Sequence, residues 1–163
     1  MNLRPLIFDL KRHSLDDGPG IRTTVFMKGC LLSCIWCHNP EAMKSGREIG
    51  FYPDACIKCG DCSTACGEGA IKQEGHRIIR DKCTSCGDCA EACPSTALKV
   101  IGRYYSSGEL IRKILEDSFF YETSRGGVTF SGGEPTLHME YLEELMRELK
   151  GYNIHIAIQT SGT

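Results

Sequence analysis

The eleven cysteines of this 163-residue chain fall into three blocks whose spacing suits metal clusters. The first block, Cys30, Cys34 and Cys37, has the pattern C-x3-C-x2-C. The other two share the pattern C-x2-C-x2-C-x3-C and comprise Cys56, Cys59, Cys62 and Cys66, followed by Cys83, Cys86, Cys89 and Cys93. A cysteine at every third position is typical of iron–sulfur ligands. Because three thiolates leave one iron of a [4Fe–4S] cluster open, we expect chemistry at the first block and electron transfer at the others.

Disulfides, zinc sites and buried structural cysteines fit this spacing less well. Disulfides form in oxidising compartments, and the N-terminal residues MNLRPLIFDLKRH lack the apolar segment of an export signal. Zinc sites usually combine two C-x2-C pairs that are separated by a longer gap. Buried structural cysteines have no reason to repeat one spacing. We therefore expect iron–sulfur clusters and a reducing, oxygen-poor cytoplasm.

Composition limits the partners that this chain can have. The formal net charge is −2 and 25% of the residues are charged, so no basic stripe is available for a nucleic-acid backbone. No apolar run approaches the roughly 20 residues that cross a bilayer. With 41% hydrophobic residues the chain has the composition of a globular protein. We expect neither a nucleic-acid partner nor a membrane partner.

Strand and helix patterns alternate around the cysteine blocks. Residues 21–27 are β-branched and apolar, which predicts a strand that leads into the first cysteine loop. A capping box opens a predicted helix over 106–121, and a short strand follows at 128–130. A second helix is predicted from Pro135 to Gly151, which should cap it, and a last strand at 154–158. This order predicts an α/β fold with parallel strands, and active sites in such folds lie at the strands' C-terminal ends.

The chain divides into three segments by composition. Residues 51–101 are rich in Gly and Cys with little periodicity, so we interpret them as a small domain inserted into a larger one formed by 1–50 and 102–163. The last predicted strand has no helix after it, and a complete eight-stranded barrel takes about 250 residues. We therefore expect a longer protein that continues beyond Thr163.

The inserted segment resembles a two-cluster bacterial ferredoxin. In that fold the fourth cysteine of each run binds the other cluster. The resemblance implies one [4Fe–4S] cluster on Cys56, Cys59, Cys62 and Cys93 and another on Cys83, Cys86, Cys89 and Cys66. Pro94 matches the proline that usually follows the fourth cysteine, whereas Gly67 departs from it. The alternative is that these clusters only hold a small domain together.

The first cysteine block resembles the signature of the radical S-adenosylmethionine superfamily, with Trp36 as its aromatic residue. The resemblance implies that S-adenosylmethionine chelates the open iron and is reductively cleaved to methionine and a 5′-deoxyadenosyl radical. Residues 131–135, SGGEP, resemble the superfamily's GGE motif, in which Gly132, Gly133 and Glu134 bind the methionine amino group. Taken alone, a Gly-Gly turn between a strand and a helix is usually without a ligand.

Further motifs narrow the resemblance to one family. The segments DGPGIR at 17–22 and CIWCHNP at 34–40 together resemble the activating enzymes of glycyl radical enzymes. That family implies the N-terminal part of a partial (β/α)6 radical S-adenosylmethionine barrel with a bacterial-type 2[4Fe–4S] ferredoxin-like insert. Its adenosyl radical abstracts hydrogen from one glycine of a partner glycyl radical enzyme.

The same resemblance assigns roles to residues outside the cluster ligands. These are Asp17 and Arg22 for partner contact, Trp36 and His38 beside the adenine, and Thr160 and Ser161 near the cofactor or a bound cation. Gln159 stands where the family often has an acidic residue, so the resemblance does not establish a monovalent-cation site at this position.

The resemblance implies three [4Fe–4S] clusters, S-adenosylmethionine, an external low-potential electron donor such as flavodoxin or ferredoxin, and a monomer. Two other functions remain open. The chain could belong to an iron–sulfur electron-transfer protein without radical activity, or to a radical enzyme that acts on a small molecule or an ordinary peptide.

Overall fold

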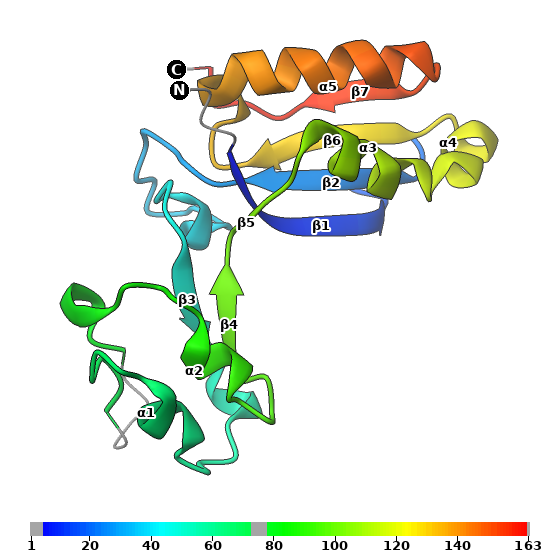
Figure 1. Ribbon diagram of the computed structural model, residues 1–163. Helices are drawn as coiled ribbons and strands as arrows, with labels where there is room; N and C mark the ends of the chain where they lie inside the picture. Colours follow the sequence, from blue (N-terminus) through cyan, green and yellow to red (C-terminus); the bar gives the residue numbers. More distant parts are fainter. Residues whose placement is uncertain (1–4, 73–77, 163) are drawn as a thin grey trace. The chain divides into compact units, whose positions relative to one another are not determined.

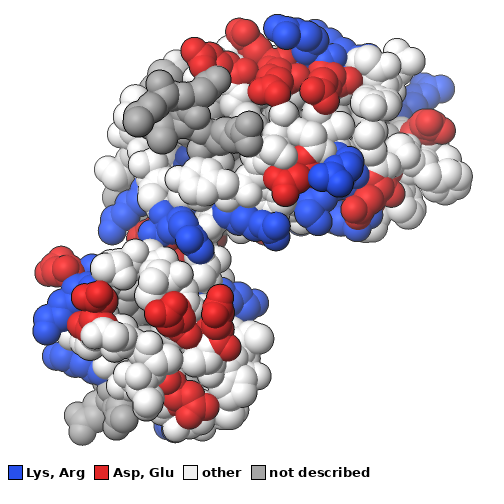
Figure 2. Space-filling view, in the orientation of Figure 1, with Lys and Arg blue, Asp and Glu red and all other residues white. Residues whose placement is uncertain are grey.

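The computed structural model describes residues 5–72 and 78–162. Contacts divide the chain into two compact units, one formed by Met1–Gly46 with Gly102–Thr163 and the other by Arg47–Ile101 (Figure 1). None of the helices in the described ranges combines the length and apolar character that a membrane span needs. On the face shown in Figure 2, acidic and basic side chains are interspersed on both units.

The first unit is built on a five-stranded mixed sheet with the order β5-β1-β2-β6-β7 (Figure 1). In chain order its strands are β1 (Leu6–Ser14), β2 (Arg22–Met27), β5 (Arg103–Tyr104), β6 (Gly127–Gly132) and β7 (His155–Ile158). Strands β2, β6 and β7 are parallel, as predicted. Strand β1 is antiparallel to both of its neighbours. The pattern of residues 6–14 does not predict this strand, because charged residues interrupt its apolar alternation.

Helices pack on one face of this sheet and form the main core. They are α3 (Ser107–Leu115), α4 (Ser118–Ser124) and α5 (Met139–Gly151), with a 3-10 turn, η5 (Pro135–His138), before α5. Val25 and Phe130 of the sheet pack with Leu110, Ile114 and Leu145 of the helices, and all five are fully buried. Burial of side chains of this size is the main favourable term in folding. Polar side chains of β2 and β6, Thr24 and Thr129, form a polar face of the sheet and bond to Asp17.

The predicted single helix over 106–121 is wrong, because the structure has two helices there. The chain turns at Asp117, which is 0% exposed and occupies the position before α4. Its Oδ2 accepts hydrogen bonds from Arg12 Nε and Thr23 Oγ1, each at 2.8 Å. Burial would raise the pKa of Asp117, but these hydrogen bonds outweigh it and lower the pKa. Phe119, after the break, is 68% exposed.

The predicted glycine cap of the later helix is also wrong. Gly151 lies inside α5, and Tyr152 takes the capping position. The left-handed backbone conformation that usually falls to glycine occurs at Asn153, with φ +57°. Asparagine tolerates this conformation better than most residues because its short polar side chain bonds locally.

Replacing Tyr121 by phenylalanine is expected to destabilise this unit by about 1–2 kcal/mol. The Tyr121 hydroxyl lies 2.6 Å from Thr23 Oγ1 and 2.9 Å from the carbonyl oxygen of Ile114. Its removal leaves these buried oxygens without that hydrogen-bond partner. Urea unfolding of the full-length protein would measure the change. Tyr104→Phe is the matched control, because that side chain is 57% exposed. Equal changes in the free energy of unfolding of both variants would contradict the stabilising role of the Tyr121 hydroxyl.

The second unit is a repeat of two similar halves. Strands β3 (Glu48–Phe51) and β4 (Leu98–Ile101) pair antiparallel. Between them lie the short turns η2 (Pro53–Ala55), α1 (Asp61–Ala65), η4 (Arg80–Lys82) and α2 (Asp88–Glu91). Corresponding positions share unusual backbone angles: φ is +60° at Lys58 and +56° at Ser85, and it is +90° at Gly60 and +108° at Gly87. The two cysteine runs therefore adopt the same local conformation.

Candidate cluster and cofactor site

The first cysteine loop leaves the C-terminal end of β2 and closes on itself. Gly29, with φ +103°, donates its N–H to the carbonyl of Ala42 at 2.7 Å, and Cys30 donates to Met43 at 3.1 Å. The Lys28 side chain is buried, and its Nζ donates to the carbonyl of Glu41. These contacts fix both ends of a loop that spans residues 30–43. The loop thus occupies the end of the sheet where active sites of parallel α/β folds lie.

The three cysteines of this loop are half-buried, and Cys37 N–H donates to the carbonyl of Cys34 at 3.1 Å. Across residues 5–72 and 78–162, no three His, Cys, Asp or Glu side chains stand close enough to hold a single metal ion. Trp36 is 74% exposed and His38 is exposed. Their packing beside an adenine stays a prediction.

The glycine motif after β6 bonds directly to the base of the cysteine loop. Gly133 donates its N–H to the carbonyl of Met27, and Glu134 donates to the carbonyl of Gly29, both at 2.7 Å. A Cβ on Gly133 would lie 2.1 Å from the Gly29 carbonyl oxygen, and one on Gly132 would lie 2.5 Å from the backbone of Met27. Both glycines are therefore required for this close approach. The sequence predicts glycines that admit a ligand, but it does not reveal this contact between the two loops.

Glu134 holds a second junction, between the ends of β6 and β7. Its side chain is 0% exposed, and within the described residues five hydrogen bonds reach its carboxylate. The donors are the N–H and hydroxyl groups of Thr136 and Ser161 and the hydroxyl of Thr160. Burial would raise the pKa of Glu134, but the hydrogen bonds outweigh it and lower the pKa to about 2. The structure thus brings together Glu134, Thr160 and Ser161.

Arg22 requires a correction, because it is 0% exposed and has no surface to offer a partner protein. Its Nε donates to Thr129 Oγ1 at 2.7 Å, and its other nitrogens lie near the Pro19 and Val128 carbonyls and His155. Burial lowers the pKa of this guanidinium. A charged residue directly after a surface-turn motif suggests exposure, but the chain's own acceptors enclose it. Arg22 instead ties the 17–22 loop to the sheet.

Asp17 lies over the polar face of the sheet and is half-buried. It accepts hydrogen bonds from Ser14 and Thr24, and Gln159 Nε2 lies 3.3 Å from its Oδ1. Burial would raise the pKa of Asp17, but these bonds lower it. Gln159 also accepts from Ser131 Oγ at 2.6 Å. The amide at position 159 therefore links Asp17 to the end of β6, a role that its position in the sequence does not reveal.

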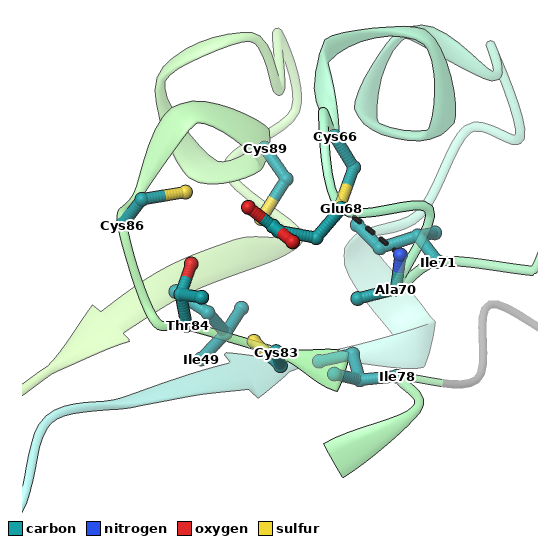
Figure 3. A pocket seen from close by; sticks show the side chains of 10 residues that line it. All are labelled: Ile49, Cys66, Glu68, Ala70, Ile71, Ile78, Cys83, Thr84, Cys86 and Cys89. Carbon is teal, nitrogen blue, oxygen red and sulfur yellow. Dashed lines mark hydrogen bonds between the residues drawn. The ribbon is translucent and has the colours of Figure 1, made fainter. Parts of the chain in front are cut away.

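The eight cysteines of the second unit line two separate cavities. The Cys66 cavity is lined by Cys66, Cys83, Cys86 and Cys89 (Figure 3). The Cys93 cavity is lined by Cys56, Cys59, Cys62 and Cys93. These are the two groups that the ferredoxin resemblance implies, with the fourth cysteine of each run beside the other run. Burial, with the neighbouring thiols, raises the pKa of Cys89 to about 11. Four thiols around one small cavity are the donor set of a [4Fe–4S] cluster.

Comparison with known proteins agrees with this donor chemistry. A family model described as a 4Fe-4S single cluster domain matches residues 16–163. The benzylsuccinate synthase activating enzyme of Thauera aromatica is 46% identical over 96% of this chain and 50% of its own length. The trans-4-hydroxy-L-proline dehydratase activating enzyme of Clostridioides difficile is 45% identical over 98% of this chain and 54% of its own.

A third relative has the same relation to this chain. The isethionate sulfite-lyase activating enzyme of Desulfovibrio desulfuricans is 44% identical over 96% of the chain and 53% of its own length. The chain thus spans about half the length of the curated relatives that it matches. It belongs to the 4Fe-4S single cluster domain family, and the relatives that it resembles are named activating enzymes.

Proposed function

We propose that this chain carries the cluster-binding part of an enzyme that activates a glycyl radical enzyme. Cys30, Cys34 and Cys37 would hold a [4Fe–4S] cluster whose open iron binds S-adenosylmethionine. When bound and reduced by an external donor, the cluster would supply one-electron reductive cleavage of the sulfonium, and the chemistry at the partner would be hydrogen abstraction from a glycine. The observation that carries the proposal is the pair of hydrogen bonds from Gly133 and Glu134 to the base of the cysteine loop.

In this proposal the residues of the chain hold the cofactor in place and do not themselves react. The Glu134 carboxylate is bonded to Thr136, Thr160 and Ser161, so it fixes the loops after β6 and β7 beside each other. That rigidity keeps the backbone of Gly132 and Gly133 in place for a cationic amino group. Asp17, held over the polar sheet face, remains our candidate for contact with the partner's glycine loop. We further propose that β2, β6 and β7 are strands of a partial (β/α)6 barrel.

The two cavities of the second unit support a relay role for it. We propose a ferredoxin-like domain over 51–101, inserted between core segments 1–50 and 102–163, with one [4Fe–4S] cluster in each cavity. An external low-potential donor such as flavodoxin or ferredoxin would reduce it, in a monomeric enzyme of an oxygen-poor cytoplasm. The same two cavities favour one alternative function, an iron–sulfur electron carrier that forms no radical.

The decisive experiment uses the full-length protein, reconstituted anaerobically with iron and sulfide and reduced with dithionite. S-adenosylmethionine is added with and without candidate glycyl radical enzymes, and 5′-deoxyadenosine and the glycyl electron paramagnetic resonance signal are measured. Both products together support the activase. Iron–sulfur signals without 5′-deoxyadenosine would leave the electron carrier, and 5′-deoxyadenosine without a glycyl signal would leave a radical enzyme with another substrate.

A further inference from the structure

The two cavities of the second unit are matched by the internal repeat but differ in one charged side chain. The segment from Cys66 to Ile71 corresponds to that from Cys93 to Leu98, so Glu68 stands where the other half has Ser95. Glu68 lines the Cys66 cavity, and Ser95 lines the Cys93 cavity. Figure 3 shows the Glu68 carboxylate projecting among the side chains of the four cysteines. One cavity therefore carries a carboxylate where its counterpart carries a hydroxyl.

The fourth cysteines of the two runs, Cys66 and Cys93, also differ in their hydrogen bonds. Cys93 Sγ lies 3.7 Å from Ser95 Oγ, whereas Cys66 Sγ accepts the Ala70 N–H at 3.3 Å and has no such hydroxyl in the corresponding position. A hydroxyl beside the Cys93 sulfur stabilises negative charge on that sulfur.

Cations near the two cysteine runs do not distinguish the cavities. Lys58, between Cys56 and Cys59, corresponds to Ser85 in the other half, but Lys82, directly before Cys83, corresponds to Ala55, so each run has one lysine that the other lacks. Thr84 opposes the effect of Glu68, because it places a hydroxyl in the Cys66 cavity where the other cavity has Ile57. A neutral dipole acts more weakly on an added electron than a full charge at similar distance, so the charged Glu68 of the Cys66 cavity decides the sign.

The reduction potential of an iron–sulfur cluster depends on its charge surroundings, on hydrogen bonds to its sulfurs and on solvent exposure. A nearby carboxylate disfavours the added electron, and a nearby cation or hydroxyl favours it. We propose that Glu68 makes the cluster of the Cys66 cavity the lower-potential member of the pair. An electron entering this unit then resides mainly on the cluster of the Cys93 cavity. The inference rests on the proposed ligation of one cluster in each cavity.

The test is a redox titration of the full-length, reconstituted protein followed by electron paramagnetic resonance. Glu68→Gln removes the charge but keeps the shape, and we expect it to raise the lower midpoint of the pair. Because the side chain is exposed and water screens its charge, the expected change is about tenfold in the reduction equilibrium, or 59 mV for one electron. Ser95→Glu should instead lower the upper midpoint. An unmoved lower midpoint in Glu68→Gln would overturn the proposal.

Asp81→Asn is the matched control, because Asp81 is an exposed acid of the same unit that lines neither cavity. We expect it to move the lower midpoint much less than Glu68→Gln does, and an equal shift would overturn the proposal by showing a general charge effect. Iron content separates this inference from the proposed function. Wild-type protein with no clusters on these eight cysteines would refute both, whereas two clusters whose midpoints ignore Glu68 refute only the inference. Glu68→Ser provides a second variant with the residue of the matched repeat.

Discussion

Replacing Cys34 by alanine in the full-length protein is expected to abolish 5′-deoxyadenosine formation and to remove about one third of the bound iron. The cluster of the first block has only three cysteines, so the loss of one leaves it without a stable ligand set. The eight cysteines that line the two cavities of the second unit are untouched. Iron analysis and product chromatography after anaerobic reconstitution would measure both effects.

Ser33→Ala is the matched control for this prediction. Ser33 is exposed, belongs to the same loop and is the direct neighbour of Cys34, so its replacement should leave iron and product unchanged. Loss of about two thirds of the iron in Cys34→Ala would contradict the assignment of ligands to blocks. Retained 5′-deoxyadenosine would contradict the catalytic role of the first block.

Local spacing predicts those parts of this molecule that depend on local contacts. The cysteine runs, the strands at 21–27 and 128–130 and the capping box before Glu109 each depend on residues within a few positions of one another. The structure has the strands and both hydrogen bonds of the capping box. The division of α3 and α4 was not predictable in this way, because it depends on Asp117 being held by Arg12, far away in the sequence.

The candidate site shows the same limit. The sequence identifies Gly133 and Glu134 as members of a ligand-binding motif, but not their bonds to Met27 and Gly29, which arise only when β6 pairs with β2. The burial of Arg22 has the same origin, because its acceptors Thr129 and Val128 lie on that neighbouring strand. Contacts across parallel strands join residues that are about a hundred positions apart, and the periodicity of the sequence does not predict them.

Glu134→Gln is expected to destabilise the first unit by about 2–3 kcal/mol at pH 7, and the deficit should shrink in acid. Whichever carboxylate oxygen the glutamine NH2 group replaces, it turns a donor toward N–H and hydroxyl groups that now donate to that oxygen. The pKa of Glu134 lies at about 2 in the folded chain, against an ordinary value of 4.5. Because the folded-state pKa is lowered, the carboxylate stabilises the fold above pH 4.5, and this contribution disappears as the pH falls toward 2.

Urea unfolding of the full-length variants, followed by far-ultraviolet circular dichroism, would measure this linkage. The stability difference between wild type and Glu134→Gln should shrink by about 2 kcal/mol between pH 7 and pH 3. Glu143→Gln is the matched control, because it removes an exposed carboxylate from α5 and should change the stability little. A stability difference that stays constant with pH would contradict this prediction, because it would show that the charge of Glu134 does not contribute. A shrinking deficit would show that the ionised carboxylate itself joins the ends of β6 and β7 beside the cysteine loop.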